Sequence, residues 1–122
     1  MKLLDSLYTI VSEDVAEGRH SYTIELDPEH FIYKAHFPGE PITPGVCIMQ
    51  IAHELLEKLC DCQLNIECVK SVKFLRVISP NENTTINYIF QKVTIDEGGV
   101  KCQVEVATEE VTFAKLSIVC SK

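Results

Sequence analysis

The stretch that decides the fold runs from residue 36 to residue 46 and reads HFPGEPITPGV. Three prolines and two glycines within eight residues hold the backbone in a rigid turn, and a single histidine, His36, stands at its start. A helix-like segment follows at once and begins at Gly45, directly after Pro44. Histidine transfers protons near neutral pH, and the first amides of a helix stabilise developing negative charge. The stretch therefore predicts an active site.

The residues from Gly45 to about Cys60 are the strongest helix candidate, because they contain no internal proline or glycine and are rich in good helix formers. Apolar side chains recur along this segment at spacings of three and four residues, namely at Val46, Met49, Ala52, Leu56 and Leu59, with Leu55 alongside. The pattern predicts a helix that is buried along much of its length.

Six further segments show β-strand patterns, and the apolar segment Phe31-Ile32-Tyr33 lies between the second strand and the turn. The predicted strands are Leu7 to Val15, Arg19 to Leu26, Val69 to Ile78, Thr84 to Val93, Val100 to Ala107 and Val111 to Val119. One long helix and six strands predict an α+β domain in which an antiparallel sheet packs around a central helix. No repeat or linker divides the 122 residues, so we expect a single domain over residues 1–122.

The formal net charge of −7 argues against general binding to nucleic acids or to anionic membranes, both of which need a cationic surface. An acidic partner would need a local basic patch. The candidate patch is formed by Lys70, Lys73 and Arg76, three cations within seven residues, although solvated side chains beside a strand explain them equally well.

The N-terminal residues lack the pattern of a signal peptide, and no apolar stretch is long enough to span a membrane, which predicts a cytoplasmic protein. In that compartment the six cysteines are expected to be reduced thiols. Cys60 and Cys62 are separated by one residue rather than two, and no nearby histidine or second pair completes a ligand set. We therefore expect no metal site.

The motif as a whole resembles the signature of the 3-hydroxyacyl-acyl-carrier-protein dehydratases, which have the hot-dog fold. The resemblance lies in His36-Phe37-Pro38-Gly39, Pro41 and Pro44-Gly45-Val46. It extends to the apolar segment before His36 and, further along, to Val72-Lys73-Phe74, Arg76 and Pro80. The similar region reaches from about Phe31 to the end of the chain.

This resemblance implies a lyase that needs no cofactor and that converts 3-hydroxyacyl thioesters on acyl carrier protein to trans-2-enoyl thioesters, in fatty acid or related polyene biosynthesis. It implies a six-stranded antiparallel sheet wrapped around the helix, and a dimer or higher oligomer with the acyl tunnel between protomers. It also implies that His36 takes the proton from C2 and that the Gly45 amide holds the thioester oxygen. Phe37, Pro44 and Val46 are then expected to line the substrate site.

The chain departs from this family at one chemically important position. The family's catalytic acid is expected five residues after Gly45, where this chain has Gln50. A carboxamide donates a hydrogen bond but has no proton to deliver, and the loss of general acid catalysis typically costs about 10²–10⁴-fold in rate. His53 and Glu54, one helical turn or about 5 Å further on, are candidate auxiliary groups, although ordinary surface roles are more common for both.

Three interpretations follow. In the first, which we prefer, the protein is an active dehydratase in which Gln50 orients the hydroxyl or a water molecule. In the second, it is a weak or inactive subunit of a heterodimer, and a related chain supplies the acid. In the third, it is a hot-dog acyl thioesterase. The residue pattern leaves open the acyl chain length and the choice between carrier protein and coenzyme A thioesters.

Overall fold

The computed structural model describes residues 2–35 and 39–122, so His36 and Phe37 lie outside the described residues. Six strands form one antiparallel sheet in the order β1-β2-β4-β5-β6-β3. The elements are β1 Tyr8–Ala16, β2 Arg19–Leu26, α1 Phe31–Ala35, α2 Gly45–Cys60, β3 Asn65–Phe74, β4 Thr85–Ile95, β5 Gly99–Ala107 and β6 Thr112–Ser121. The predicted α+β class and six-stranded antiparallel sheet are confirmed.

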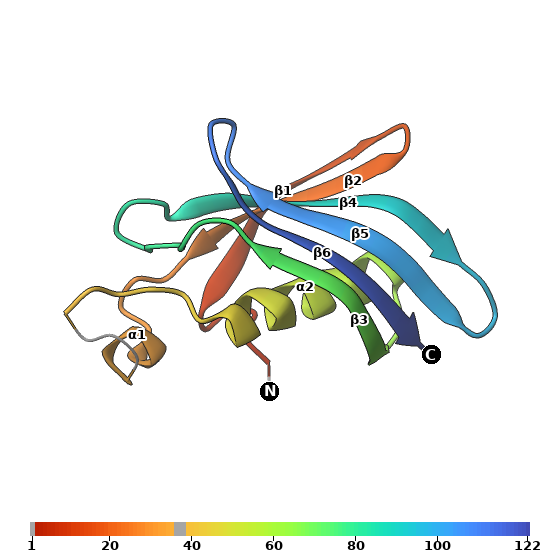
Figure 1. Cartoon of the computed structure of the whole chain (residues 1–122), viewed down its shortest axis with the longest axis horizontal. Coiled ribbons are helices and arrows are strands. Elements are labelled where there is room, and N and C mark those ends of the chain that lie inside the picture. Colours follow the sequence, from red (N-terminus) through yellow and green to blue (C-terminus); the bar gives the residue numbers. More distant parts are fainter. Residues whose placement is uncertain (1, 36–38) are drawn as a thin grey trace.

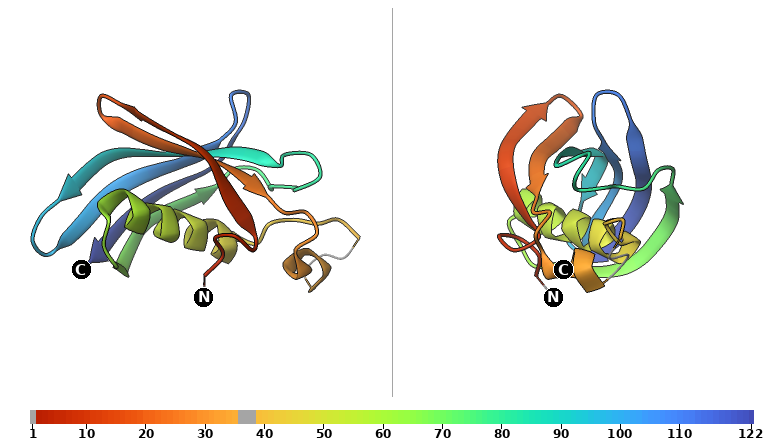
Figure 2. Two further views of the ribbon diagram at one scale, coloured as in Figure 1. Left: turned by 180° about the vertical axis from the view of Figure 1, so that it is seen from behind. Right: turned by 90° about the vertical axis from the view of Figure 1, so that its left-hand side faces the viewer.

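The sheet curves around α2, which runs along its concave side (Figure 1). Two further views show β1 and β2 on one side of the helix and β3 on the other (Figure 2). The helix packs through six buried side chains: Cys47, Ile48, Ile51, Ala52, Leu55 and Leu56. The hydroxyl of Tyr88, on β4, donates a buried hydrogen bond of 3.0 Å to the carbonyl oxygen of Ile48 and so fixes the helix against the sheet.

The bounds of α2 agree with those predicted, but the predicted inward face is partly wrong. Ala52 and Leu56 are buried, and Met49 and Leu59 are partly buried against the core. Val46, however, is 65% exposed. Val46 therefore lies outside the face of α2 whose buried residues pack against the sheet.

Strand β3 lies about four residues earlier than predicted at both ends. The alternating apolar pattern continues to Ile78, but pairing with β6 ends when the amides of Leu75 and Arg76 both donate to the carbonyl oxygen of Phe113, at 2.8 and 3.2 Å. Residues 75–78 therefore leave the sheet. The apolar segment from Phe31 forms α1, and the hydroxyl of the buried Tyr33 lies 2.9 Å from that of Thr43.

Strand β3 is an edge of the sheet, and almost all of its residues are exposed. Large apolar side chains are exposed beside this edge as well: Phe74 is 51% exposed and Val77 is 64% exposed. Among the described residues, no helix has the length and hydropathy needed to cross a membrane.

Candidate active site

The first turn of α2 has backbone amides available to a ligand. Pro44 is the N-cap residue, and it supplies no side-chain acceptor. The amides of Cys47 and Ile48 donate to the carbonyl oxygen of Pro44, at 3.0 and 3.1 Å. Within residues 2–35 and 39–122, no acceptor is bonded to the amides of Gly45 and Val46. Two N–H groups at the positive end of a helix form a site for a developing oxyanion.

Gly45 allows an aromatic ring to lie directly against this turn. A Cβ atom at this position would stand 3.0 Å from Cζ of Phe74, at the end of β3. Any other residue would force the ring to move. The glycine therefore matters here for the close approach of Phe74 to the helix.

A groove of 490 Å³ lies between the start of α2 and the chain that follows β3. Its lining is mostly apolar and consists of Ile42, Thr43, Pro44, Gly45, Ile48, Phe74, Leu75, Arg76, Val77 and Ile78. Among the described residues that line the groove, Arg76 is the only charged one. Such a groove suits an acyl chain, with the first turn of α2 at its wall.

Gln50 lies on the other flank of the helix from this groove. Its Nε2 donates a hydrogen bond of 2.9 Å to Oε2 of Glu54. Since a carboxylate oxygen only accepts, this contact assigns the NH₂ group of Gln50 to the side of Glu54 and directs Oε1 away from it. Gln50 and the groove therefore belong to different sides of α2 in one chain.

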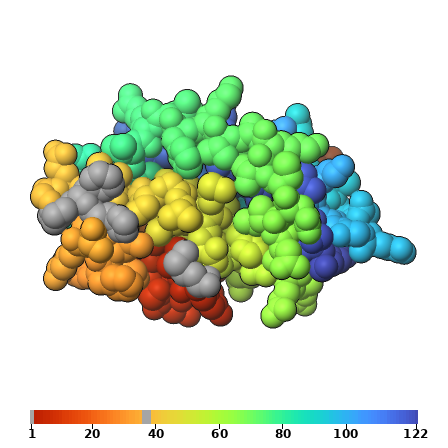
Figure 3. All heavy atoms as spheres, turned by 60° about the horizontal axis from the view of Figure 1, so that its bottom comes forward, coloured from red at the N-terminus to blue at the C-terminus, as the bar shows by residue number. Residues whose placement is uncertain are grey.

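Glu54 is not the solvated surface residue that its position suggested. Its Oε2 accepts from the amide of Leu3 at 2.7 Å, and its Oε1 accepts from the amide of Leu4 at 2.9 Å. The hydroxyl of Tyr8 donates to Oε1 at 3.0 Å. Burial and the neighbouring carboxylate raise the pKa of Tyr8 well above its usual range, so this hydroxyl remains a donor. Glu54 thus anchors the N-terminal segment to α2. Figure 3 shows this segment, in red, beside the yellow surface of the helix.

His53, the second candidate auxiliary group, belongs to a different set of contacts. Its Nε2 donates to the carbonyl oxygen of Leu64 at 2.6 Å and lies 3.7 Å from Oε2 of Glu57. The same Glu57 oxygen accepts from the amide of Leu64 at 2.9 Å. These contacts hold the chain that leaves the C-terminal end of α2. Of the two candidate auxiliary groups, Glu54 is the one with a hydrogen bond to Gln50 among the described contacts.

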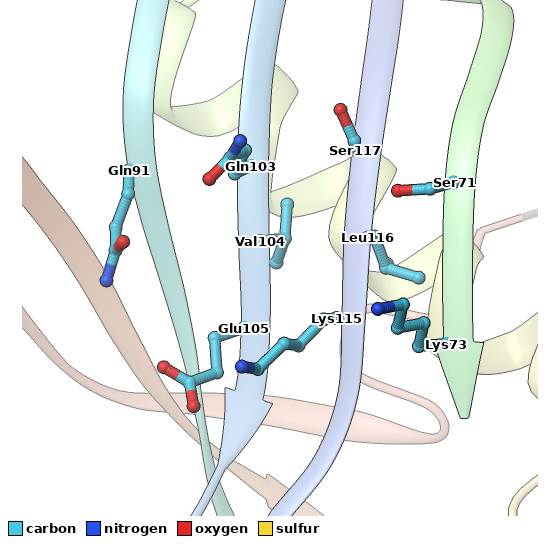
Figure 4. A pocket seen from close by; sticks show the side chains of 9 residues that line it. All are labelled: Ser71, Lys73, Gln91, Gln103, Val104, Glu105, Lys115, Leu116 and Ser117. Atoms are coloured by element: carbon cyan, nitrogen blue, oxygen red, sulfur yellow. The ribbon is translucent and has the colours of Figure 1, made fainter. Parts of the chain in front are cut away.

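The three cations of the predicted basic patch do not share one surface. Arg76 lines the groove at α2, whereas Lys73 lines a separate hollow of 270 Å³. Figure 4 shows this hollow on the outer face of the sheet, with α2 behind the strands and the Lys115 side chain directed towards Glu105. Lys70 lines another hollow, together with Lys92 and Lys101. The sequence cluster is therefore divided between two faces.

Comparisons with known proteins agree with the geometry. The family model described as ApeI-like, the ApeI dehydratase, matches residues 12–115. The 3-hydroxyacyl-[acyl-carrier-protein] dehydratase FabZ of Latilactobacillus sakei is 26% identical over 126 residues, covering 98% of this chain and 87% of that enzyme. FabZ of Lactobacillus helveticus is 29% identical over 94 residues, which span 71% of this chain but only 64% of that enzyme's length.

Among solved structures, the dehydratase heterocomplex ApeI:P from Xenorhabdus doucetiae matches with a TM-score of 0.67 and 17% identity. The match covers 93% of this chain and 96% of that chain. At this identity the likeness shows the fold, and it confirms the predicted hot-dog fold.

Proposed function

Because the chain belongs to the ApeI-like family of dehydratases, we propose that it dehydrates 3-hydroxyacyl thioesters on acyl carrier protein to trans-2-enoyl thioesters. The observation that carries this proposal is the first turn of α2, where the amides of Gly45 and Val46 have no partner among the described residues and Gly45 lines an apolar groove. The substrate's acyl chain occupies the groove beside Pro44, and Val46 contributes its backbone amide at the start of α2. Residues 1–122 act as one domain.

Proton removal from C2 places negative charge on the thioester oxygen. The amides at the start of α2 stabilise this charge, because they are fixed in place before the reaction and lie at the positive end of the helix. In this proposal His36 is the base, and an imidazole is suited to that task near neutral pH. Phe37 lies next to it in sequence and contacts the substrate.

The reaction needs no separate acid to supply a proton, because the proton taken from C2 can be used to form the water molecule. Elimination removes one proton from C2 and one hydroxide from C3, and the two together make one water molecule. The imidazolium formed at His36 carries the proton from C2 and can transfer it to the departing hydroxyl group. Gln50 then needs only to orient the hydroxyl, which supports the active interpretation over the inactive-subunit interpretation.

The proposed partner at β3 is a second copy of this chain or a related chain. An edge strand with exposed backbone groups and apolar side chains is suited to pairing with another edge. Because Gln50 and the groove lie on different flanks of α2, a shared site between two protomers would unite them. The acyl carrier protein delivers its thioester to this shared site.

Purified protein tests the proposal with a 3-hydroxyacyl carrier-protein thioester, with enoyl formation followed by mass spectrometry and molar mass by light scattering. Turnover by the chain alone, as a dimer, is the expected result. Turnover only after addition of a related acid-bearing chain would instead identify a heterodimer subunit. Release of a free acid and a free thiol would identify a thioesterase, and the coenzyme A substrate serves as the control for carrier recognition.

A further inference from the structure

We propose that Glu54 is a positioning residue that fixes the amide of Gln50, so that Gln50 presents its oxygen rather than its NH₂ group to the substrate. This inference rests on the proposed function and adds a role for a residue outside the groove. It starts from the hydrogen bond of 2.9 Å between Nε2 of Gln50 and Oε2 of Glu54.

A glutamine side chain alone has two nearly equal orientations, because its oxygen and NH₂ group have similar shapes. The carboxylate removes this ambiguity, since it accepts hydrogen bonds and repels the amide oxygen. Glu54 lies four residues after Gln50, so the two side chains are neighbours on one helical face. Glu54 therefore constrains the orientation of the Gln50 amide from within α2.

Glu54 can set this orientation because it is itself held in place. Its Oε1 accepts from the Leu4 amide and the Tyr8 hydroxyl, and its Oε2 accepts from the Leu3 amide and from Gln50. Tyr8 is 1% exposed and packs in the core. A carboxylate with four donors from three parts of the chain cannot turn without breaking several bonds, so it forms a rigid support.

The direction of the amide matters for the reaction. An amide oxygen accepts the hydrogen of the C3 hydroxyl and leaves the lone pairs of that hydroxyl available for the proton from the imidazolium. An NH₂ group would instead donate to one of these lone pairs and compete with the proton. Glu54 therefore acts through Gln50, and it need not touch the substrate.

The competing explanation is that Glu54 only anchors the N-terminal segment. A double-mutant cycle with Glu54→Gln and Gln50→Met separates the two roles. We expect Glu54→Gln to lower kcat by about 10- to 100-fold with a smaller change in KM, because a misplaced group at a reacting centre costs about that much. In the Gln50→Met background, the same change should cost nothing further in kcat.

Two controls accompany the cycle. Glu57→Gln alters the next carboxylate along α2, which bonds the Leu64 amide, and it should leave kcat unchanged. Tyr8→Phe removes one donor to Glu54 but keeps the bond from Gln50, so it should lower thermal stability more than kcat. If Glu54→Gln lowers kcat by the same factor in the Gln50→Met background as in the wild type, the inference is overturned and Glu54 is only an anchor of the N-terminal segment.

NMR spectroscopy reads the orientation without any turnover. The side-chain NH₂ signals of Gln50 are identified by their loss in Gln50→Met, and they should be protected from solvent exchange in the wild type and lose this protection in Glu54→Gln. Equal, rapid exchange in both proteins would overturn the inference. If Glu54→Gln fails to fold, the exchange rate of the Gln50 NH₂ signals in the wild type still tests the inference, because rapid exchange there would contradict it. Inactive wild type with protected Gln50 signals would refute the proposed function alone.

Discussion

The two ends of α2 are built in opposite ways. At the N-terminal end, Pro44 offers no side-chain cap, and within the described part of the chain the next two amides bond to nothing. At the C-terminal end, Asp61 adopts a left-handed conformation with φ of 54°, and the amides of Asp61 and Cys62 return to the last carbonyls of the helix. Glu57 and His53 bind both backbone groups of Leu64. Within the described chain, the helix thus keeps unbonded amides at its N-terminal end, where a ligand could bind, and satisfied backbone groups at its C-terminal end, which stabilise the fold.

The largest expected effect is that of replacing His36, the proposed base, compared with replacing His53 at the C-terminal end of α2. His36→Ala should lower dehydration by about 10²–10⁴-fold, because it removes the proposed base. His53→Ala is the matched change at the stable end, where the side chain bonds the Leu64 carbonyl, and it should leave kcat nearly unchanged. Steady-state assays and circular dichroism of both variants test this contrast. Near-normal turnover by His36→Ala would remove the proton-transfer role from His36.

The next effect concerns the acid position. Gln50→Glu puts a second carboxyl against Glu54, so the pKa of the new group should be raised and the pair should share one proton. The protonated form can supply the missing acid, and we expect kcat to rise by up to about 10²-fold. A variant slower than wild type at every pH would show that the amide itself is required.

The same variant has a predicted pH signature in stability. A carboxyl with a raised folded-state pKa binds its proton more tightly in the folded than in the unfolded protein. Gln50→Glu should therefore be most stable relative to wild type at pH values below the ordinary glutamate pKa. It should lose this stability as the pH rises through the folded-state pKa. Thermal unfolding of both proteins across this range measures the difference, and parallel curves would contradict proton sharing.

A smaller effect is expected at the stable end of α2. Glu57→Ala leaves the Leu64 amide without its acceptor, and Leu64 is a buried residue, so the free energy of unfolding should fall by about 1–3 kcal/mol. Activity per folded molecule should stay the same. Urea denaturation measures the loss, with Glu109→Ala at an exposed turn as the control.

The smallest effect concerns thiol reactivity along the helix. Cys47 lies in the first turns but is fully buried, and burial raises the pKa of its thiol. Cys62 follows the stable end and is partly exposed. Iodoacetamide should modify Cys47 about tenfold or more slowly than Cys62, as measured by mass spectrometry of peptides. Equal rates would mean that the N-terminal turn opens as a whole, rather than offering only its amides.

The elements that the sequence predicted correctly have strong local signals. The bounds of α2 and β2 agree because Pro44 precedes the helix and because Gly18, with φ of 75°, and Asp27-Pro28 enclose the strand. The position of β3 was wrong because its end depends on where β6 stops pairing, which residues 69–78 do not encode.

The candidate site shows the same division. The first turn of α2 and the departure at Gln50 could be recognised from sequence, since both lie within one motif. The role of Glu54 could not, because its donors Leu3, Leu4 and Tyr8 lie about fifty positions away in sequence. Nothing in the spacing of α2 distinguishes Glu54 from Glu57. The roles of His36 and Phe37 remain predictions, because these residues lie outside the described part of the chain.

The exposed edge of β3 also sets a condition on how the protein is made. An uncovered strand is a template for any other strand that meets it, so a chain synthesised in excess of its pairing partner is prone to aggregate. Loss of soluble protein should then depend on the ratio in which two chains are produced rather than on the stability of either fold. If the partner is a different chain, balanced production of both becomes a requirement for solubility, and the yield of this chain reports on its partner.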